Sequence, residues 1–303
     1  MRCDSKSRSV VSRVWLFAAA VALLLAACSS GVRIGYSYAD TLLLYTIDGY
    51  VGLTPEQEQL VRERSSALVA WHRSTQLRDY AQFIQEARRK LDGPVSAGDV
   101  LAFNRAVNVR LATLGERAAP DLAQLALTLS PEQLARLERK LASDNSKARR
   151  ELVQLAGKGT LEERVHKVAQ RADYWFGSLT PEQLDIVRTT LAGRPDSGAW
   201  WIEERERRQR EFVAVLQRIQ SERPGEDAAA RWLRDYFAQL QAPSDPERRR
   251  ATEQVRAATA ELIARLINAA TPEQRATLSR RLGSFADDFA ALASERSGGA
   301  APG

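Results

Sequence analysis

Apolar side chains recur at every third or fourth position over most of the chain, which is the spacing of one face of an α-helix. The stripe is clearest at Val100, Phe103, Val107, Leu111 and Leu114, and again at Leu278, Leu282, Phe285, Phe289 and Leu292. A broader stripe predicts one long helix over residues 55–91. A short helix is expected over Ala39–Val51, with its apolar side either joining the core or touching a bilayer surface. Runs of β-branched residues with period two are nearly absent, so the pattern predicts an all-α protein, an elongated multi-helix bundle.

Turn-forming residues divide this pattern into separate helices. Breaks are expected at residues 92–94, 157–159, 193–195, 224–225 and 242–243, where Gly or Pro interrupts the stripe. Pro120 lies inside a helical pattern, so it is expected to kink that helix or to restart it. The small, apolar-poor tail over residues 297–303 is expected to be disordered.

The N-terminus departs from the helical pattern. Four basic residues and one acidic residue precede a 14-residue apolar run, Val14–Ala27, and Leu25-Ala-Ala-Cys28 closes that segment. A run of this length suits a secretory signal and is shorter than the roughly 18 apolar residues that a membrane-spanning helix needs. The Leu-Ala-Ala-Cys sequence resembles the lipobox of a bacterial lipoprotein signal peptide.

This resemblance implies that residues 1–27 are a cleaved signal peptide and that Cys28 becomes the first residue, modified with acyl chains such as palmitate. Residues 28–52 would then form a lipidated lead-in beside the membrane. Several acyl chains give a durable anchor, whereas one chain binds only marginally. Ser29 after the cysteine favours the outer membrane, with the protein facing the periplasm. The alternatives are an ordinary cleaved signal with a chance cysteine and an uncleaved membrane anchor.

Removing the leader changes the charge balance. The whole chain carries 44 basic and 38 acidic residues, a formal charge of +6, and without residues 1–27 it carries 40 and 37, about +3. Balanced charge in a cell-envelope compartment disfavours nucleic acid as a partner. Both cysteines, Cys3 and Cys28, lie in the leader or at the anchor. The mature chain therefore has no disulfide available, and its stability must come from burial.

A five-residue phrase occurs four times, as Leu53-Thr-Pro-Glu-Gln57, Leu129-Ser-Pro-Glu-Gln133, Leu179-Thr-Pro-Glu-Gln183 and Ala270-Thr-Pro-Glu-Gln274. Its hydroxyl residue is a favoured helix N-cap, its proline suits the first helical position, and its glutamine can complete a capping box. We therefore predict helix N-caps at Thr54, Ser130, Thr180 and Thr271. The phrase also resembles the Leu-Thr-x-x-Gln motif of the small Spy-like periplasmic chaperones, which implies binding of unfolded proteins as a functional alternative.

A second resemblance covers most of the chain after the leader. The order is the lipobox, then Tyr36-x-x-Ala-Asp-x-Leu-Leu43, Tyr50 before the first motif, Trp71-His-Arg73, and Trp175-Phe-Gly177 before the third motif. This order resembles an uncharacterised family of proteobacterial helical lipoproteins, known as a domain of unknown function. The resemblance implies lipoprotein status and helical character, and it implies no activity.

The positions of the motifs suggest an internal duplication. Thr54, Val61, Trp71 and Phe83 align with Thr180, Val187, Trp200 and Phe212 at offsets of 126 to 129 residues. The helical domain over residues 53–296 would then contain two similar helical units, at 53–157 and 179–296.

Few residues offer chemistry. His72 and His166 are the only histidines, and without cysteine or a ligand cluster we expect no metal, no cofactor and no catalytic residue. Trp200 and Trp201 precede a charged segment over 202–210. Either one tryptophan enters the core while Glu and Arg pair at i,i+4, or the two form a binding rim for peptides, glycans or lipid headgroups. The expected i,i+4 pairs are Glu203–Arg207, Glu204–Arg208 and Glu206–Arg210.

The sequence thus favours a lipid-anchored envelope protein that acts through binding or scaffolding, with the membrane and an envelope protein as its partners. It is not expected to be an enzyme. One alternative is a chaperone-like binder of unfolded envelope proteins. Another is an envelope hydrolase that uses carboxylates on peptidoglycan or lipid, since carboxylates are plentiful.

Overall fold

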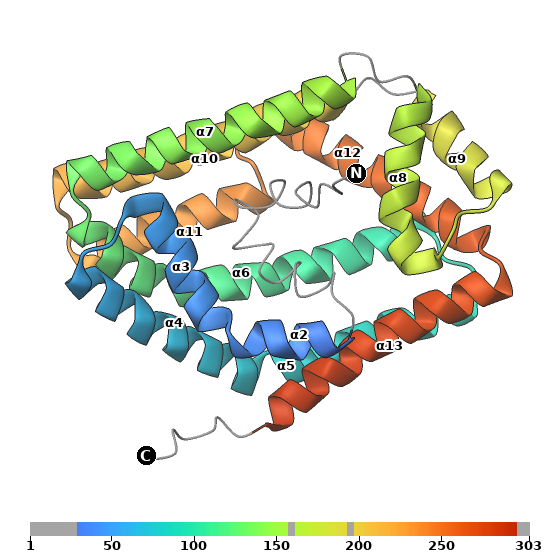
Figure 1. Cartoon of the computed structure of the whole chain (residues 1–303), viewed down its shortest axis with the longest axis horizontal. Coiled ribbons are helices and arrows are strands. Elements are labelled where there is room, and N and C mark those ends of the chain that lie inside the picture. Colours follow the sequence, from blue (N-terminus) through green and yellow to red (C-terminus); the bar gives the residue numbers. More distant parts are fainter. Residues whose placement is uncertain (1–28, 157–160, 193–196, 296–303) are drawn as a thin grey trace, which may run out of the picture. The chain divides into compact units, whose positions relative to one another are not determined.

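The computed structural model describes residues 29–156, 161–192 and 197–295 (Figure 1). These residues form twelve α-helices and one 3-10 helix, and the described part of the chain contains no strand, so the prediction of an all-α multi-helix protein is confirmed. The predicted leader, Cys28, the breaks at 157–159 and 193–195, and the tail at 297–303 lie outside the described residues.

The helices are α2 (Ser29–Ser37), α3 (Ala39–Val51), α4 (Pro55–Thr75), α5 (Leu77–Arg89), η1 (Lys90–Asp92), α6 (Ala97–Thr128), α7 (Pro131–Ala156), α8 (Leu161–Phe176), α9 (Pro181–Ala192), α10 (Ser197–Glu222), α11 (Glu226–Gln241), α12 (Pro246–Asn268) and α13 (Pro272–Ser294). They divide into two compact units. Of the described residues, unit 1 comprises 29–67, 120–156 and 198–233, and unit 2 comprises 68–119, 161–192, 197 and 234–295. The units interleave along the chain, whereas the predicted pseudo-repeats were contiguous, and duplication stays a prediction.

Unit 1 is organised around the antiparallel helices α7 and α10, which run side by side in Figure 1. Three side-chain contacts fix their register, because Glu138, Asn145 and Arg149 of α7 meet Gln217, Gln209 and Glu206 of α10 at 2.6, 2.5 and 2.5 Å. Helix α3 also packs on α7. The apolar side of α7 is buried through Leu134, Leu137 and Leu141, the i,i+3,i+4 spacing that its sequence predicts.

Unit 2 is organised around the pairing of α5 with α13. Helix α5 buries one face, formed by Leu77, Tyr80, Ala81 and Ile84. Tyr80 meets Phe289 of α13 edge to face with ring centroids 6.0 Å apart, a favoured aromatic geometry. Helices α8, α9 and α12 complete the core through Val165, Val187 and Leu266, among others.

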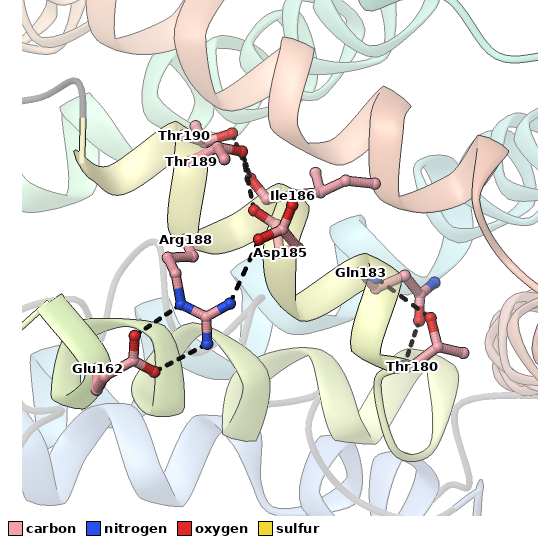
Figure 2. A network of polar contacts seen from close by, with 8 residues as sticks. All are labelled: Glu162, Thr180, Gln183, Asp185, Ile186, Arg188, Thr189 and Thr190. Atoms are coloured by element: carbon pink, nitrogen blue, oxygen red, sulfur yellow. Dashed lines mark hydrogen bonds and ion pairs between the residues drawn. The ribbon is translucent and has the colours of Figure 1, made fainter.

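Polar contacts hold α8 against α9 in unit 2. The Arg188 guanidinium donates to both carboxylate oxygens of Glu162, at 2.6 and 3.0 Å, and also reaches Asp185 on its own helix (Figure 2). The side chains are largely exposed, so this ion pair orients the helices more than it stabilises them.

Two helix boundaries differ from the prediction. The predicted helix over 55–91 ends at Thr75 and restarts at Leu77. Just before this break, Ser74 and Thr75 donate their hydroxyls to the carbonyls of Ala70 and Trp71 at 2.9 and 2.7 Å. Such bonds compete with the helical ladder. Conversely, α6 runs on through Pro120, so the helix does not restart there. The predicted helix over Ala39–Val51 is observed with the same bounds.

Candidate functional site

The four motif copies all form complete capping boxes. In each, the backbone N–H of the glutamine donates to the cap hydroxyl at 3.2–3.4 Å, and the glutamine Oε1 accepts the backbone N–H of the cap residue at 2.9–3.0 Å. The cap residues are Thr54, Ser130, Thr180 and Thr271, and Figure 2 shows the third box. Each box satisfies two backbone donors at a helix start.

In unit 1 the first and second copies lie against each other through their glutamines. Gln57 donates to Gln133 Oε1 at 3.2 Å, and Gln133 donates to Gln57 Oε1 at 2.6 Å. Gln57 Nε2 also donates to the Thr128 carbonyl at 3.1 Å, and Gln133 Nε2 donates to the Gly52 carbonyl at 2.8 Å. Each glutamine thus satisfies a carbonyl in the segment that leads into the other's motif. We call this arrangement a glutamine clasp.

Gly52 positions one end of the clasp. It ends α3 with φ +69°, and its N–H donates to the Asp48 carbonyl at 2.7 Å. Glycine adopts this left-handed conformation without steric cost. A Cβ added here would also meet the Arg136 guanidinium, which can shift because it ends a flexible side chain. The positive φ is therefore the main reason for glycine at this position, and the Gly52 carbonyl accepts from Gln133.

Unit 2 repeats the clasp with the third and fourth copies. Gln274 Nε2 donates to Gln183 Oε1 at 2.9 Å and to the Ser178 carbonyl at 2.7 Å. Gln183 Nε2 donates to the Leu266 carbonyl at 3.1 Å, in the last turn of α12. Because Ala270 N–H bonds Ile267 instead, the Leu266 carbonyl needs this side-chain donor. Helix ends leave such carbonyls without intrahelical partners.

The clasp is a feature that the sequence analysis missed. A capping box accepts Glu as well as Gln, yet all four copies have Gln. Only the amide offers a donor in addition to the acceptor that the box uses. In the clasp, that Nε2 donor bonds a backbone carbonyl of the partner segment. The repeated choice of Gln over Glu was therefore the signal that could have predicted it.

The clasp of unit 1 forms part of a hollow with a volume of about 360 Å³. Its lining residues come from three segments of unit 1, the end of α3, the start of α4 and the α6–α7 turn. They are Gly52, Thr54, Glu56, Gln57, Leu60, Thr128, Ser130 and Gln133. The volume falls in the range of small-molecule and side-chain pockets, so this hollow is the candidate functional site.

Acidic side chains lie at the starts of α4 and α7 in unit 1. The backbone N–H of Glu56 and the Thr54 hydroxyl lower the pKa of the Glu56 carboxyl, and the Thr54 hydroxyl donates to it at 2.8 Å. The Ser130 hydroxyl and the backbone N–H lower the pKa of Glu132 in the same way. Both carboxylates therefore remain ionised at neutral pH, where they complement the positive ends of their helices.

A second polar cluster joins α3, α7 and α10 of unit 1. The Tyr50 hydroxyl donates to the Asp144 carboxylate at 3.0 Å, and Lys140 reaches the same carboxylate at 3.3 Å. Beside it, Arg205 donates to Asn145 Oδ1 at 2.8 Å, and Asn145 donates to Gln209. Burial lowers the pKa of the Arg205 guanidinium, while the negative charge of the Asp144 carboxylate opposes that shift. The cluster joins three helices through hydrogen bonds that are buried or partly buried.

Trp200 and Trp201, the predicted rim, are both half-buried at the start of α10. The Arg205 guanidinium lies 5.7 Å from the centroid of the Trp201 ring, within the range of a cation–π contact. Neither tryptophan lines the hollow. The proposed role of the pair as a binding rim stays a prediction.

The ion pairs of α10 differ partly from the prediction. Glu204 accepts from Arg208 at 2.7 Å, as expected, and Glu206 reaches Arg210 at 4.0 Å. Arg207, expected to pair with Glu203, instead contacts Glu204 and Glu211. Although burial raises the pKa of Glu204, the hydrogen bonds from Arg207 and Arg208 outweigh it and lower the pKa to about 2.

Both histidines belong to unit 2, and neither lines the hollow. His72 is buried, with its ring 5.2 Å from the Tyr80 ring in an edge-to-face arrangement, and burial lowers its pKa to about 4. His166 contacts Gln170 on its own helix at 2.9 Å. Among the residues that the structure describes, no group of three His, Cys, Asp or Glu side chains is placed to hold a metal ion.

Comparison with known proteins identifies a family. The model of DUF6279, a family of unknown function, matches residues 49–235 of the chain. The matched segment contains Tyr50, every residue that lines the hollow, and the first three motif copies. No curated protein and no solved structure matches the chain.

Proposed function

The chain belongs to this family of unknown function, and from that premise we propose that it is a lipid-anchored envelope protein that binds a protein partner through the hollow of unit 1. In this proposal Cys28 is the lipid-modified residue, the anchor lies in the outer membrane, and the helical units face the periplasm. No described helix is long and apolar enough to cross a bilayer.

The observation that carries the binding proposal is the rigid construction of the hollow. Gln57 and Gln133, which are both buried, hold each other and two backbone carbonyls through four hydrogen bonds. Leu60 offers apolar surface, while Thr54 and Glu56 place a hydroxyl and a carboxylate beside it. A preformed concave surface that combines apolar area with a few fixed polar groups is typical of binding sites.

The lining favours binding over hydrolysis. A hydrolase that acts through carboxylates needs two of them, about 5–10 Å apart, across the reacting bond. The hollow offers the carboxylate of Glu56 alone among its lining residues, and an exposed carboxylate with a lowered pKa is a poor proton donor at neutral pH. We therefore propose a binding role and no catalytic one.

The anchoring proposal rests on the position of Cys28. The cysteine follows the apolar run over residues 14–27 directly, and α2 begins at the next residue. In cells that process lipoproteins, labelled palmitate should enter the wild-type protein and should not enter the Cys28→Ala variant, because the thiol accepts the diacylglyceryl group. Equal labelling of the two proteins would disprove the anchor.

Site-specific photo-crosslinking tests the binding proposal. A benzophenone amino acid replaces Glu56, which lines the hollow, and in a matched variant it replaces Glu58, which is exposed on the same helix and does not line it. Irradiation of cells that carry the full-length protein should give one discrete adduct for position 56 and none for position 58.

The pattern of adducts separates the alternatives. A ladder of many adducts at position 56 would favour a chaperone-like binder of unfolded proteins over a single partner. Identical adducts at positions 56 and 58, or no adduct at position 56, would show that the hollow is not the binding surface.

A further inference from the structure

Helices α2 and α3 of unit 1 leave an apolar face exposed. Ile34, Tyr38, Leu42 and Tyr45 are 61, 61, 57 and 75% exposed. Ile34 lies on α2, and Tyr38 lies at the junction between the two helices. Leu42 and Tyr45, three residues apart, lie on one side of α3. The four residues are half of the large hydrophobic side chains that the described residues expose; the others are scattered on α6 and α12. Single exposed apolar residues are ordinary, whereas a continuous row indicates a contact surface.

Other residues of the same two helices are already buried. Val32, Tyr36, Leu44 and Val51 are buried, and α3 packs on α7. The Tyr50 hydroxyl adds its hydrogen bond to Asp144. The exposed row is therefore not the core face of a misplaced helix. It is a second apolar face, which stays exposed while the first is buried.

The exposed face has the composition of a membrane interface. The exposed residues from Ile34 to Tyr45 are Ile34, Ser37, Tyr38, Thr41, Leu42 and Tyr45, so none of them is ionised. Tyrosine favours the boundary between headgroups and acyl chains, since its ring is apolar and its hydroxyl is polar. Arg33, exposed at the start of the row, suits the anionic headgroups that surround such a helix.

The position of the row along the chain indicates that a membrane contacts it. Only Cys28 separates α2 from the apolar run over residues 14–27. At about 1.5 Å per helical residue, Ile34 lies roughly 9 Å and Tyr45 roughly 26 Å along the helices from Cys28. A chain held in a bilayer at Cys28, by its lipid or by an uncleaved leader, thus keeps the row within reach of the membrane surface at high effective concentration.

We propose that the face formed by Ile34, Tyr38, Leu42 and Tyr45 lies in the interfacial layer of the membrane, with α2 and α3 as interfacial helices. This inference rests on the proposed membrane anchoring. The strength with which such helices bind a membrane increases with the apolar area that they bury in it. The contact adds a second attachment beside the lipid and restrains unit 1 against the bilayer.

Spin-label accessibility tests this inference in the lipidated full-length protein. A nitroxide is attached to a Tyr45→Cys variant, and in a matched control to a Val109→Cys variant, since Val109 is 64% exposed on α6 of unit 2. Each protein is reconstituted into vesicles of phosphatidylethanolamine and phosphatidylglycerol. The label at position 45 should collide several times more with oxygen, which concentrates in lipid, than with a water-soluble nickel complex, and the label at position 109 should show the opposite preference.

A second variant checks that the row itself makes the contact. With Ile34, Tyr38 and Leu42 all changed to serine, the label at position 45 should become accessible to the nickel complex, while circular dichroism and palmitate labelling remain unchanged. A nickel-accessible label at position 45 in otherwise wild-type protein would overturn the inference. So would a label shielded from both reagents, or spin–spin broadening, since these would indicate a protein partner or a second copy on this face. Palmitate labelling of Cys28→Ala reports on the anchor separately.

Discussion

Each unit builds its clasp from two motif glutamines, but the surroundings of the two clasps differ. In unit 1, Gln57 and Gln133 border a hollow of about 360 Å³ that is open to solvent. In unit 2, Gln183 is fully buried, and its amide reaches into the last turn of α12. The comparison shows that the motif is a structural joint between helix starts. A clasp can take part in binding only where the surrounding residues leave it beside a hollow, as in unit 1.

The largest effect is expected from replacing a clasp glutamine with glutamate. Glutamate keeps the acceptor that the capping box needs but loses the amide donor, so the substitution breaks the clasp without removing the cap. In unit 2, Gln183→Glu would bury a carboxylate beside the Leu266 carbonyl and should lower the free energy of unfolding by about 3–4 kcal/mol. In unit 1, water in the hollow can solvate the new carboxylate, so Gln57→Glu should cost about 1–2 kcal/mol.

Denaturant unfolding of the full-length protein, followed by far-ultraviolet circular dichroism, measures both losses. Gln59→Glu on the exposed side of α4 is the matched control. It loses only the exposed hydrogen bond to Glu63, so it should lower stability by about 0.5 kcal/mol or less. Equal losses for Gln57→Glu and Gln183→Glu would break the distinction between a solvated and a sealed clasp.

The free energy of unfolding should fall at acid pH because of His72, which belongs to unit 2. Burial lowers its folded-state pKa to about 4 from an ordinary 6.5, so the unfolded chain binds the proton more tightly. Stability is therefore lost as the pH falls below 6.5, and the loss reaches about 3 kcal/mol near pH 4, at 1.36 kcal/mol per pKa unit. Unfolding measured across this range should fall more steeply for wild type than for His72→Gln. Parallel profiles would show that His72 has the same pKa in the folded protein as in the unfolded chain.

The smallest effects are expected at the caps, which the two units share. Thr54→Ala and Thr180→Ala should each destabilise the protein by about 1 kcal/mol, because each removes the hydroxyl that accepts a backbone N–H. Thr189→Ala is the control, since that hydroxyl donates only to carbonyls of its own helix (Figure 2). Unchanged stability in Thr54→Ala, combined with loss of the adduct at position 56, would make the first motif a recognition element.

The sequence predicted the local features and missed those that depend on distant segments. The helical period and the cap residues were sufficient to predict the fold class and the four helix starts, because both depend on neighbours within a few residues. The pairing of Gln57 with Gln133 joins residues 76 positions apart, and no local spacing encodes it. The hollow exists only because that pairing brings two helix starts together.

The misplaced helix ends have local causes that periodicity does not register. Gln76 keeps the chain nearly helical, since its N–H bonds the His72 carbonyl and its own carbonyl accepts from Tyr80. The apolar stripe therefore passes through the break unchanged. At Pro120 the opposite holds, because α6 continues despite the missing donor. A proline within a helix is costly, and tertiary packing outweighs that cost here: Ala118, Ala119 and Ala123 on either side are buried.

The interleaving of the two units governs how the chain can fold during synthesis. Unit 1 lacks its last segment until residue 233 has been made, and unit 2 lacks α13 until almost the whole chain is complete. The bond between Arg88 and Ser279 alone closes a loop of 191 residues. Contacts between segments so distant in sequence form slowly and leave apolar surface unpaired meanwhile. A ribosome that stalls before α13 would release a chain in which Leu77, Tyr80 and Ile84 have lost their partner helix, so premature termination should yield an aggregation-prone product instead of a shorter working one.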